Sequence, residues 1–277
     1  LDLINRDGVN DVIKRWKPNH IIHCAAESHV DNSISEPALF LESNVLGTFN
    51  LIEAIRLNPY PQFQSLIHVS TDEVFGHLGA SGMFDLESKY APNNPYSASK
   101  ASSDMLVRAW RQTYNLPFII TNCSNNYGPF QHSEKMIPKT IDAILRGSHV
   151  TIYGDGLNVR NWLYVEDHVD CLLRLLTYSG QHYQFLIGSD IELNNNELVD
   201  RIHRTIQRHK PEVSLKIRNV DDRPGHDFRY SIDYSVTSSE LYWEYTELWS
   251  YSCRTWRAFG VPAAGDHAET INTRNIN

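Results

Sequence analysis

Apolar residues in this chain form short runs that alternate with longer stretches of helical periodicity. The short runs predict buried strands at residues 21–26, 66–70, 118–123, 183–187 and 213–217. Between them, apolar positions that recur every three or four residues predict helices at 37–57, 95–114, 136–145, 165–176 and 196–208. Strands that alternate with helices of this length are typical of an α/β protein with a largely parallel sheet.

Composition and charge narrow the class of protein. The 277 residues are 41% hydrophobic and 21% charged, which is ordinary for a soluble globular protein with a full core. The formal net charge is −8 and the basic residues are scattered, which argues against a nucleic-acid partner. No apolar run approaches the ~20 residues that span a bilayer, and no signal peptide is recognisable, so no membrane partner is expected.

The four cysteines indicate the cellular compartment rather than a site. Cys24, Cys123, Cys171 and Cys253 are isolated and have neither metal-binding nor redox spacing. Cys24 and Cys123 lie in strand-like apolar runs and are predicted to be buried. We therefore expect a cytoplasmic protein with unpaired thiols and no metal site.

The first candidate for chemistry is a Tyr–Lys pair at the start of the helix predicted at 95–114. Tyr96 and Lys100 are spaced so that both side chains lie on one face of this helix. An ammonium group close to a phenol favours the phenolate, which makes Tyr96 a candidate base near neutral pH. Such a pair is weak evidence by itself, because an exposed Tyr and Lys often share a helix face by chance.

A second candidate set, Thr71, Asp72 and Glu73, directly follows the strand predicted at 66–70. Adjacent residues of an extended backbone point to opposite sides, so both carboxyl groups reach one substrate only if they lie in a bend past the strand. The set would then lie at the carboxyl ends of the strands, where α/β sheets bind ligands. Together with Tyr96 and Lys100, an acid and a base here indicate hydride transfer coupled to removal of water.

Seven segments resemble, in the same order, those of a known family. They are residues 23–31 (HCAAESHVD), 70–74 (STDEV), 94–104 (NPYSASKASSD), 122–129 (NCSNNYGP), 134–138 (EKMIP), 161–168 (NWLYVEDH) and 222–227 (DRPGHD). On these segments the chain resembles the extended short-chain dehydrogenases/reductases, also called the NAD-dependent epimerase/dehydratase family, and among them the dTDP-glucose 4,6-dehydratases.

The resemblance implies a Rossmann-type doubly wound parallel sheet that lacks its first β-α-β segment, with a smaller C-terminal α/β substrate-binding part. The expected division is an incomplete NAD-binding domain at 1–130, which also packs residues 165–190, and a nucleotide-sugar-binding part at 131–245. Residues 246–277 depart from the family pattern and are expected to form a disordered tail.

The resemblance also implies a role for each candidate residue. Tyr96 deprotonates the 4-hydroxyl of dTDP-glucose while hydride passes from C4 to NAD, and Thr71 hydrogen-bonds the same hydroxyl. Lys100 binds the nicotinamide ribose. Glu73 removes the proton from C5, and Asp72 protonates the departing 6-hydroxyl. Hydride then returns to C6, which gives dTDP-4-keto-6-deoxyglucose for deoxysugar or rhamnose biosynthesis.

Other family positions carry over residue by residue. The cofactor NAD is expected to contact Asp2, Leu3, Ala25, Ala26, Glu27, Ser28, Ser43 and Asn126, in addition to Tyr96 and Lys100. The nucleotide-sugar substrate is expected to contact Ser28, His29, Thr71, Asn125, Lys135, Met136, Thr151, Ile152, Tyr153, Arg160, Asn195, Asp222, Arg223, Pro224, Gly225 and His226. Arginines at 160 and 223 suit a diphosphate, because a guanidinium group binds phosphate oxygens bidentately.

The chain departs from the family pattern at its start. The family begins with a strand, a Gly-rich turn and a helix N-terminus that hold the cofactor pyrophosphate, and by resemblance roughly 55 to 60 such residues are missing. Gly76, Gly79 and Gly82 have a suggestive spacing, but no clear helix follows them, so they are expected to form a loop over the active site. Asn161 stands where the family usually has Asp.

Two alternatives stay open. An epimerase or decarboxylase of the same superfamily would share Tyr96 and Lys100 but would not need the Asp72–Glu73 pair. An inactive fragment or pseudoenzyme would still bind a nucleotide sugar.

The resemblance further implies a homodimer that pairs the helices predicted at 37–57 and 95–114. The residues expected to contact the substrate do not decide whether its base is thymine or uracil, although the SASKASSD run at 97–104 favours a thymidine nucleotide.

Overall fold

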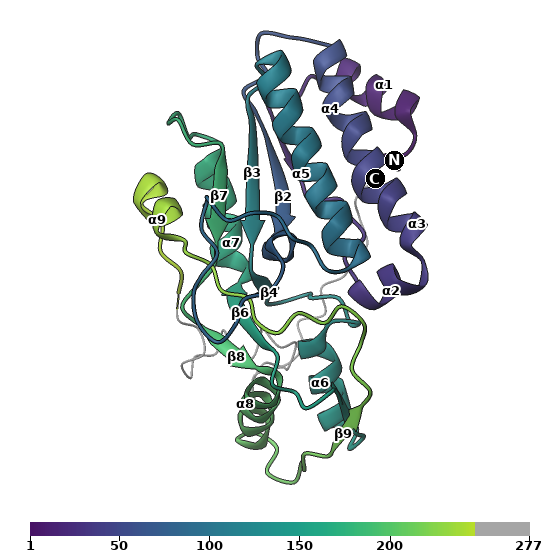
Figure 1. Ribbon diagram of the computed structural model, residues 1–277, viewed down its shortest axis with the longest axis vertical. Helices are drawn as coiled ribbons and strands as arrows, with labels where there is room; N and C mark the ends of the chain where they lie inside the picture. The colour runs from purple at the N-terminus through teal and green to yellow at the C-terminus, as the bar shows by residue number, and fades with distance from the viewer. Residues whose placement is uncertain (247–277) are drawn as a thin grey trace, which may run out of the picture.

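Four parallel strands form the main sheet of the computed structural model, which describes residues 1–246 (Figure 1). Their order is β1 (His20–His23), β2 (Ser65–Thr71), β3 (Phe118–Cys123) and β7 (Gln184–Ile187). In the register of β2 and β3, Ser70 lies opposite Asn122. Because the strands are parallel, their carboxyl ends meet at one edge of the sheet, where polar residues follow β1, β2 and β3.

Helices cover both faces of the main sheet (Figure 1). One face packs against α1 (Arg6–Trp16), α4 (Gly47–Leu57) and α5 (Pro95–Tyr114). The other face packs against α7 (Val165–Leu175) and α9 (Ser235–Leu241). Alternate residues of one strand serve the two cores, since Leu66 contacts the first set of helices and Ile67 the second. The predicted α/β class with a Rossmann-like parallel sheet is confirmed.

A smaller part lies beyond the carboxyl edge, at the lower end of Figure 1. Its strands are short and mixed in direction: β4 (Asn125–Tyr127), β6 (Val159–Tyr164) and β8 (Glu192–Asn194) form one sheet, and β5 (Val150–Tyr153) and β9 (Ile217–Val220) form another. The helices α6 (Met136–Leu145) and α8 (Asn195–Gln207) share one apolar core with β4, β5, β6 and β8.

The predicted helix 37–57 forms one helical stretch with an irregular middle. It consists of α3 (Pro37–Phe40), a π-helix called η1 (Leu41–Leu46) and α4, and it follows the short helix α2 (Val30–Ser35). The stretch Pro37–Leu57 is long and apolar enough to cross a membrane, with a mean hydropathy of 1.2, which the sequence pattern did not indicate. However, 50% of its most apolar window is buried inside the protein. Core helices commonly meet the same criteria.

Some expectations are wrong. The strand predicted at 213–217 is absent, and the chain instead forms β9 four residues later, where it pairs with β5. The helix α1 was not predicted, because only Val9 and Ile13 of its residues are buried. Cys24 is exposed rather than buried, because β1 ends at His23 and the chain then leaves the sheet. The expected tail falls almost wholly on residues 247–277, which lie outside the described part of the chain.

Candidate active site

The chain bends sharply where β2 ends. A 3₁₀-helix, η2 (Asp72–Phe75), starts directly after Thr71, and the Thr71 hydroxyl accepts a hydrogen bond from the Glu73 backbone N–H at 3.3 Å. Gly76 ends this turn with φ of 86°, and a Cβ there would lie 2.5 Å from the Ala91 carbonyl oxygen. The predicted bend is therefore confirmed, and it allows Asp72 and Glu73 to serve one site.

The first two turns of α5 carry the Tyr–Lys pair. Asn94 caps the helix by accepting a hydrogen bond from Ser97 N at 2.8 Å, and Pro95 occupies the first turn. Tyr96 is 9% exposed and Lys100 is 3% exposed, so the helix face that their spacing predicted they would share is buried. The Lys100 ammonium donates to the carbonyl oxygen of Val69 on β2 at 2.9 Å, which ties the helix to the strand that carries Thr71.

Burial dominates the electrostatics of this pair. It raises the pKa of Tyr96 well above its usual value, the charge of Glu73 raises it further, and a hydrogen bond with Thr71 lowers it only in part. Burial also lowers the pKa of Lys100. Burial therefore opposes the expected effect of Lys100, because the low-dielectric site disfavours both the phenolate and the ammonium, and the role of Tyr96 as a base stays a prediction.

The two carboxyl groups are shifted toward their protonated forms. Burial and the neighbouring charge of Glu73 raise the pKa of Asp72 to about 8. Burial also raises the pKa of Glu73, although the guanidinium charges of Arg160 and Arg223 oppose the shift. A carboxyl group that keeps its proton near neutral pH is suited to act as a general acid, which fits the role expected of Asp72.

Several buried polar atoms at the carboxyl edge have no hydrogen-bond partner. They are His29 Nδ1, Asp72 Oδ2, Glu73 Oε2, Ser124 Oγ and Asn125 Oδ1. The residues follow β1, β2 and β3, three neighbouring strands, so they come from the same edge of the sheet. An unpaired buried polar group costs about 1–3 kcal/mol, so this edge suits a ligand rich in hydroxyl groups.

Most of the residues expected to contact the cofactor lie in the segment of the sequence that runs from the end of β1 to the start of α5. Ala25, Ala26 and Ser28 lie in the loop after β1, and Ser43 lies in the π-helix η1. Asn126, on β4 just past the end of β3, accepts from His168 at 3.0 Å. Asp2 and Leu3 lie apart from this loop, before α1, where the Leu3 carbonyl oxygen accepts from the Asn50 side chain at 2.9 Å.

Sequence reasoning missed Asn44, which organises the cofactor side. Its Oδ1 accepts from the Glu27 backbone N–H at 2.8 Å, while its Nδ2 donates to the Glu27 carbonyl oxygen and to Ser99 Oγ, each at 2.9 Å. These bonds join the loop after β1 to η1 and α5. An Asn within an apolar helix was the only sequence signal, because a π-helix leaves no periodicity of its own.

The residues expected to contact the nucleotide are linked to α2 by polar contacts. Lys135 Nζ donates to the Ser28 carbonyl oxygen at 2.7 Å. Asp31 accepts from Tyr153 OH at 3.0 Å and from Arg223 Nη1 at 3.2 Å. Burial alone would raise the pKa of Asp31, but these hydrogen bonds and the Arg223 charge hold it below its usual value. Asp31 was not singled out from the sequence, although it ends the segment 23–31.

The remaining residues expected to contact the substrate differ in the exposure and the contacts of their side chains. Arg160 is buried, donates to the carbonyl oxygens of Val159 and Asp227, and stacks 4.4 Å from the centroid of Tyr230. Thr151 is exposed, but the Ile152 side chain lies in the apolar core, so only its backbone could face a ligand. The others lie at or near the ends of elements: Met136 at the start of α6, Asn195 at the start of α8, and Asp222, Pro224, Gly225 and His226 in the turn after β9.

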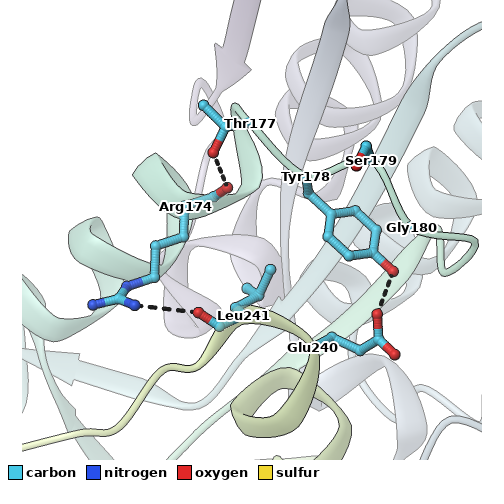
Figure 2. Close-up of a pocket in the computed structure, with 7 residues that line it drawn as sticks. All are labelled: Arg174, Thr177, Tyr178, Ser179, Gly180, Glu240 and Leu241. Carbon is cyan, nitrogen blue, oxygen red and sulfur yellow. Dashed lines mark hydrogen bonds between the residues drawn. The ribbon is translucent and has the colours of Figure 1, made fainter.

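A hollow of about 400 Å³ lies at the opposite edge of the main sheet. Figure 2 shows its lining, which includes Arg174 on α7, Tyr178 after α7 and Glu240 on α9. Arg174 donates to the Leu241 carbonyl oxygen at 3.2 Å, and Tyr178 donates to Glu240 at 2.8 Å. Because Tyr178 precedes β7, this hollow adjoins the amino ends of the strands and contains none of the residues predicted for catalysis.

Known proteins are similar to this chain in sequence and in fold. A family model described as GDP-mannose 4,6 dehydratase matches residues 1–253. The dTDP-glucose 4,6-dehydratase of Xanthomonas campestris pv. campestris (strain B100) is 44% identical over 247 residues, which cover 85% of this chain and 70% of that protein. The enzyme of the same name from Neisseria meningitidis serogroup B is 42% identical over 257 residues, covering 88% and 72%.

Solved structures of proteins with the same name are also similar to this chain in fold. The dTDP-glucose 4,6-dehydratase of Streptomyces venezuelae with NAD and TYD bound gives a TM-score of 0.84 at 36% identity, over 94% of this chain and 77% of that one. A Bacillus anthracis dTDP-glucose 4,6-dehydratase in complex with NAD gives 0.78 at 38% identity over the same shares. A UDP-glucose 4-epimerase of Thermus thermophilus gives 0.83 at 23% identity, over 94% of this chain and 82% of that one, which shows a shared fold alone.

The class is thus the extended short-chain dehydrogenases/reductases, whose fold epimerases and dehydratases share. Within that class the chain belongs to the family of dTDP-glucose 4,6-dehydratases, which are hydro-lyases. The resemblance seen in the sequence is confirmed at the level of the family. The roles of individual residues stay predictions.

Proposed function

We propose that this chain catalyses the NAD-dependent dehydration of dTDP-glucose to dTDP-4-keto-6-deoxyglucose, as a step of deoxysugar and rhamnose biosynthesis. One observation carries the proposal: partnerless buried polar atoms of Asp72, Glu73 and Asn125 gather at the sheet edge that also holds Tyr96 and Lys100. A sugar ring would satisfy these atoms with its hydroxyl groups, and each of the two carboxyl groups can then exchange a proton with it.

The cofactor side fits a dinucleotide. Small exposed side chains of Ala25 and Ala26 leave the backbone after β1 open to close approach. Lys100 gives one of its three hydrogens to Val69, so the other two suit ribose hydroxyls. When bound, NAD supplies the hydride acceptor for C4 and returns the hydride at C6. Lys100 and Asn126 are the residues that would hold its nicotinamide end.

The protein's own groups would move the protons. Tyr96, as the phenolate, takes the proton of the 4-hydroxyl, while Thr71 orients this hydroxyl. Glu73 removes the C5 proton, which the 4-keto group has made acidic. Asp72, whose pKa is raised to about 8, gives its proton to the departing 6-hydroxyl, so that water leaves across C5 and C6.

The diphosphate would lie between the two parts of the molecule. Arg223 presents a partly exposed guanidinium beside Tyr153, and Lys135 lies across from it at Ser28. These cations are donors of the kind that bind phosphate oxygens. Arg160 donates to backbone carbonyls, so we assign it the shaping of the site and a partial contact to the diphosphate.

The test is incubation of the purified chain with dTDP-glucose and NAD, followed by the alkali-induced absorbance of the 4-keto-6-deoxy product. Product formation in deuterium oxide with one solvent deuteron at C5 supports the proposal. A product that keeps its 6-hydroxyl would favour the epimerase alternative. Binding of dTDP-glucose without any product, in a sample shown to bind NAD, would favour a pseudoenzyme. UDP-glucose as a competing substrate tests the preference for thymidine.

We also propose a homodimer that pairs α3, α4 and α5 of two copies. Leu46 and Met105 are exposed on this side of the molecule, at 42% and 45%. Apolar side chains that a partner copy covers would stabilise such a pair. Sedimentation at micromolar concentration tests it, and a monomer there would refute it.

A further inference from the structure

A buried carboxylate lies behind the proposed catalytic residues. Asp104 is on α5 one turn beyond Lys100, which is itself one turn beyond Tyr96, so the three side chains share one face of the helix. Asp104 is fully buried, with 0% of its surface exposed. A buried carboxyl group needs a charge partner or a set of hydrogen-bond donors, and the proposed reaction does not use this one.

Three donors hydrogen-bond Asp104. Its Oδ2 accepts from Ser70 Oγ at 2.9 Å, from Tyr90 OH at 2.9 Å and from Asn122 Nδ2 at 3.1 Å. His68 Nε2 lies 3.1 Å from its Oδ1 but hydrogen-bonds Ser103 Oγ at 3.2 Å, and Oδ1 has no hydrogen-bond partner. A carboxylate accepts through both oxygens, whereas a protonated acid would need an acceptor for its own hydrogen. Three neighbouring side chains therefore offer their hydrogens to this carboxyl group.

The orientations of two of these donors are fixed by other bonds. Gln184 Nε2 donates to Tyr90 OH at 3.2 Å and to Asn122 Oδ1 at 2.8 Å. The Tyr90 hydrogen is therefore directed to Asp104, and the Asn122 amide group donates in the same direction. The Asn122 Nδ2 also donates to the Thr71 carbonyl oxygen at 3.2 Å. The network thus reaches the last residue of β2.

The charge of Asp104 acts on Lys100 and opposes the effect of burial on the pKa of Lys100. Titratable groups face Lys100 from every element packed against it: His23 on β1, His68 on β2, Cys24 after β1, Cys123 at the end of β3, and Tyr96 on α5. Burial lowers the pKa of both histidines, to about 2 for His23, and raises the pKa of both thiols, to about 12 for Cys123. These groups are therefore uncharged near neutral pH. Burial likewise raises the pKa of Tyr96, Asp72 and Glu73.

We propose that Asp104 is a positioning residue of the active site that acts through Lys100, by balancing its buried ammonium charge, and through Ser70 and Asn122, by fixing the end of β2 that carries Thr71. It touches neither substrate nor cofactor. The inference rests on the proposed role of Lys100. It explains how an ammonium group can stay charged in a site that is otherwise apolar or neutral at the pH of the reaction.

The direct test is the titration of Lys100 in the full chain, followed by NMR of lysines labelled with ¹³C at Cε and assigned with Lys100→Arg. Asp104→Asn keeps the shape of the side chain but removes its charge. Because a nearby negative charge favours the ammonium, the pKa of Lys100 should fall by about one unit or more in this variant. The high-pH limb of kcat should move to lower pH by a similar amount.

Tyr90→Phe is the matched control, because it removes one donor to Asp104 and leaves the carboxylate in place. It should leave the titration of Lys100 within a few tenths of a unit of the original. An unchanged Lys100 titration in Asp104→Asn would overturn the proposal. So would an equal shift in Tyr90→Phe, which would assign the effect to packing rather than charge.

A second variant covers the case in which Asp104→Asn does not fold. Lys100→Met leaves Asp104 as a buried charge without its cation, so the variant should lose more stability at pH 8 than at pH 5, where the carboxyl group can take up a proton. A loss that is equal at both values, measured by urea unfolding, would contradict charge coupling. Neither titration nor unfolding needs turnover, so a failure of the proposed function would be seen separately.

Discussion

The two ends of the proposed substrate site differ in how far their side chains are buried and in how their charges are paired. Around Tyr96 and Lys100 the side chains are almost fully buried, and burial is the largest cause of every pKa shift. Around Asp31 and Arg223 the side chains keep 32% and 21% of their surface, and oppositely charged groups already pair. The first region controls where protons reside, and the second offers charge to an anion.

This difference shows how one substrate could be both held and changed. A general acid needs a pKa near the working pH, which burial provides for Asp72 at a cost in stability. Diphosphate binding needs cations that solvent can reach, so that a ligand can enter and leave. We therefore expect substitutions in the buried region to change kcat and stability, and those in the exposed region to change binding and its dependence on salt.

The largest effect should come from Tyr96→Phe, which tests whether the buried region performs chemistry. Loss of a general base costs about 10²–10⁴-fold in rate, so kcat should fall by about a thousandfold. Binding of dTDP should change by less than about threefold, as measured by calorimetry. Tyr114→Phe, at the exposed end of the same helix, is the control and should keep full activity. A fall in binding that matches the fall in kcat would erase the contrast between the regions.

Glu73→Gln should separate the two halves of the reaction. The amide can still accept hydrogen bonds but cannot remove the C5 proton, so overall turnover should fall by about 10²–10³-fold. Oxidation at C4 should still occur, and a 4-keto sugar that retains its 6-hydroxyl should accumulate. Mass spectrometry of the quenched mixture detects it. Loss of C4 oxidation as well would assign Glu73 a different role.

Asp72→Asn tests the stability cost of the buried acid. The pKa of Asp72 is raised to about 8 in the folded state, so wild-type stability is lost as pH rises from the unfolded value toward 8. Asparagine cannot ionise, so the variant should gain roughly 5 kcal/mol relative to wild type at pH 8 and less than about 1 kcal/mol at pH 4. Urea unfolding at both values measures this, and an equal effect at both would contradict it. Activity should fall about a hundredfold.

Arg223→Met tests the exposed region. A hydrogen bond to a charged group contributes about 1.5–3 kcal/mol, so dTDP should bind about tenfold or more weakly, with a shallower salt dependence. The kcat at saturating substrate should change little. Arg204→Met, which removes an exposed arginine paired with Asp200 on α8, is the control. A large fall in kcat for Arg223→Met at saturation would show that the two regions are not separable.

The smallest effect should come from Asp31→Asn. The Asp31 carboxylate pairs with the Arg223 guanidinium at 3.2 Å, and an ion pair that solvent still reaches contributes about 0.2–1 kcal/mol. Its removal should tighten binding of dTDP by about two- to fivefold, and the gain should shrink at high salt. Asp200→Asn is the matched control. Weaker binding in Asp31→Asn would mean that this carboxylate supports the ligand rather than competing with it.

Local patterns in the sequence determined much of this molecule. Alternating strands and helices predicted the α/β class, and α5 runs from Pro95 to Tyr114 as its apolar positions and first-turn proline indicated. The spacing of Tyr96 and Lys100 placed both on one helix face, and the alternation of side chains along a strand required the bend at Asp72. These features depend on residues close in sequence, whose geometry a helix or strand fixes by itself.

Only the tertiary structure decided how these groups are charged and held. The high pKa of Tyr96, the donors around Asp104 and the contact of Asp31 with Arg223 join segments far apart in the chain. The π-helix that carries Asn44 and the exposure of Cys24 likewise depend on packing. A pKa is set by burial and by neighbouring charges, and both come from the assembled fold. The sequence therefore named most of the candidate residues, while the fold determined their electrostatic state.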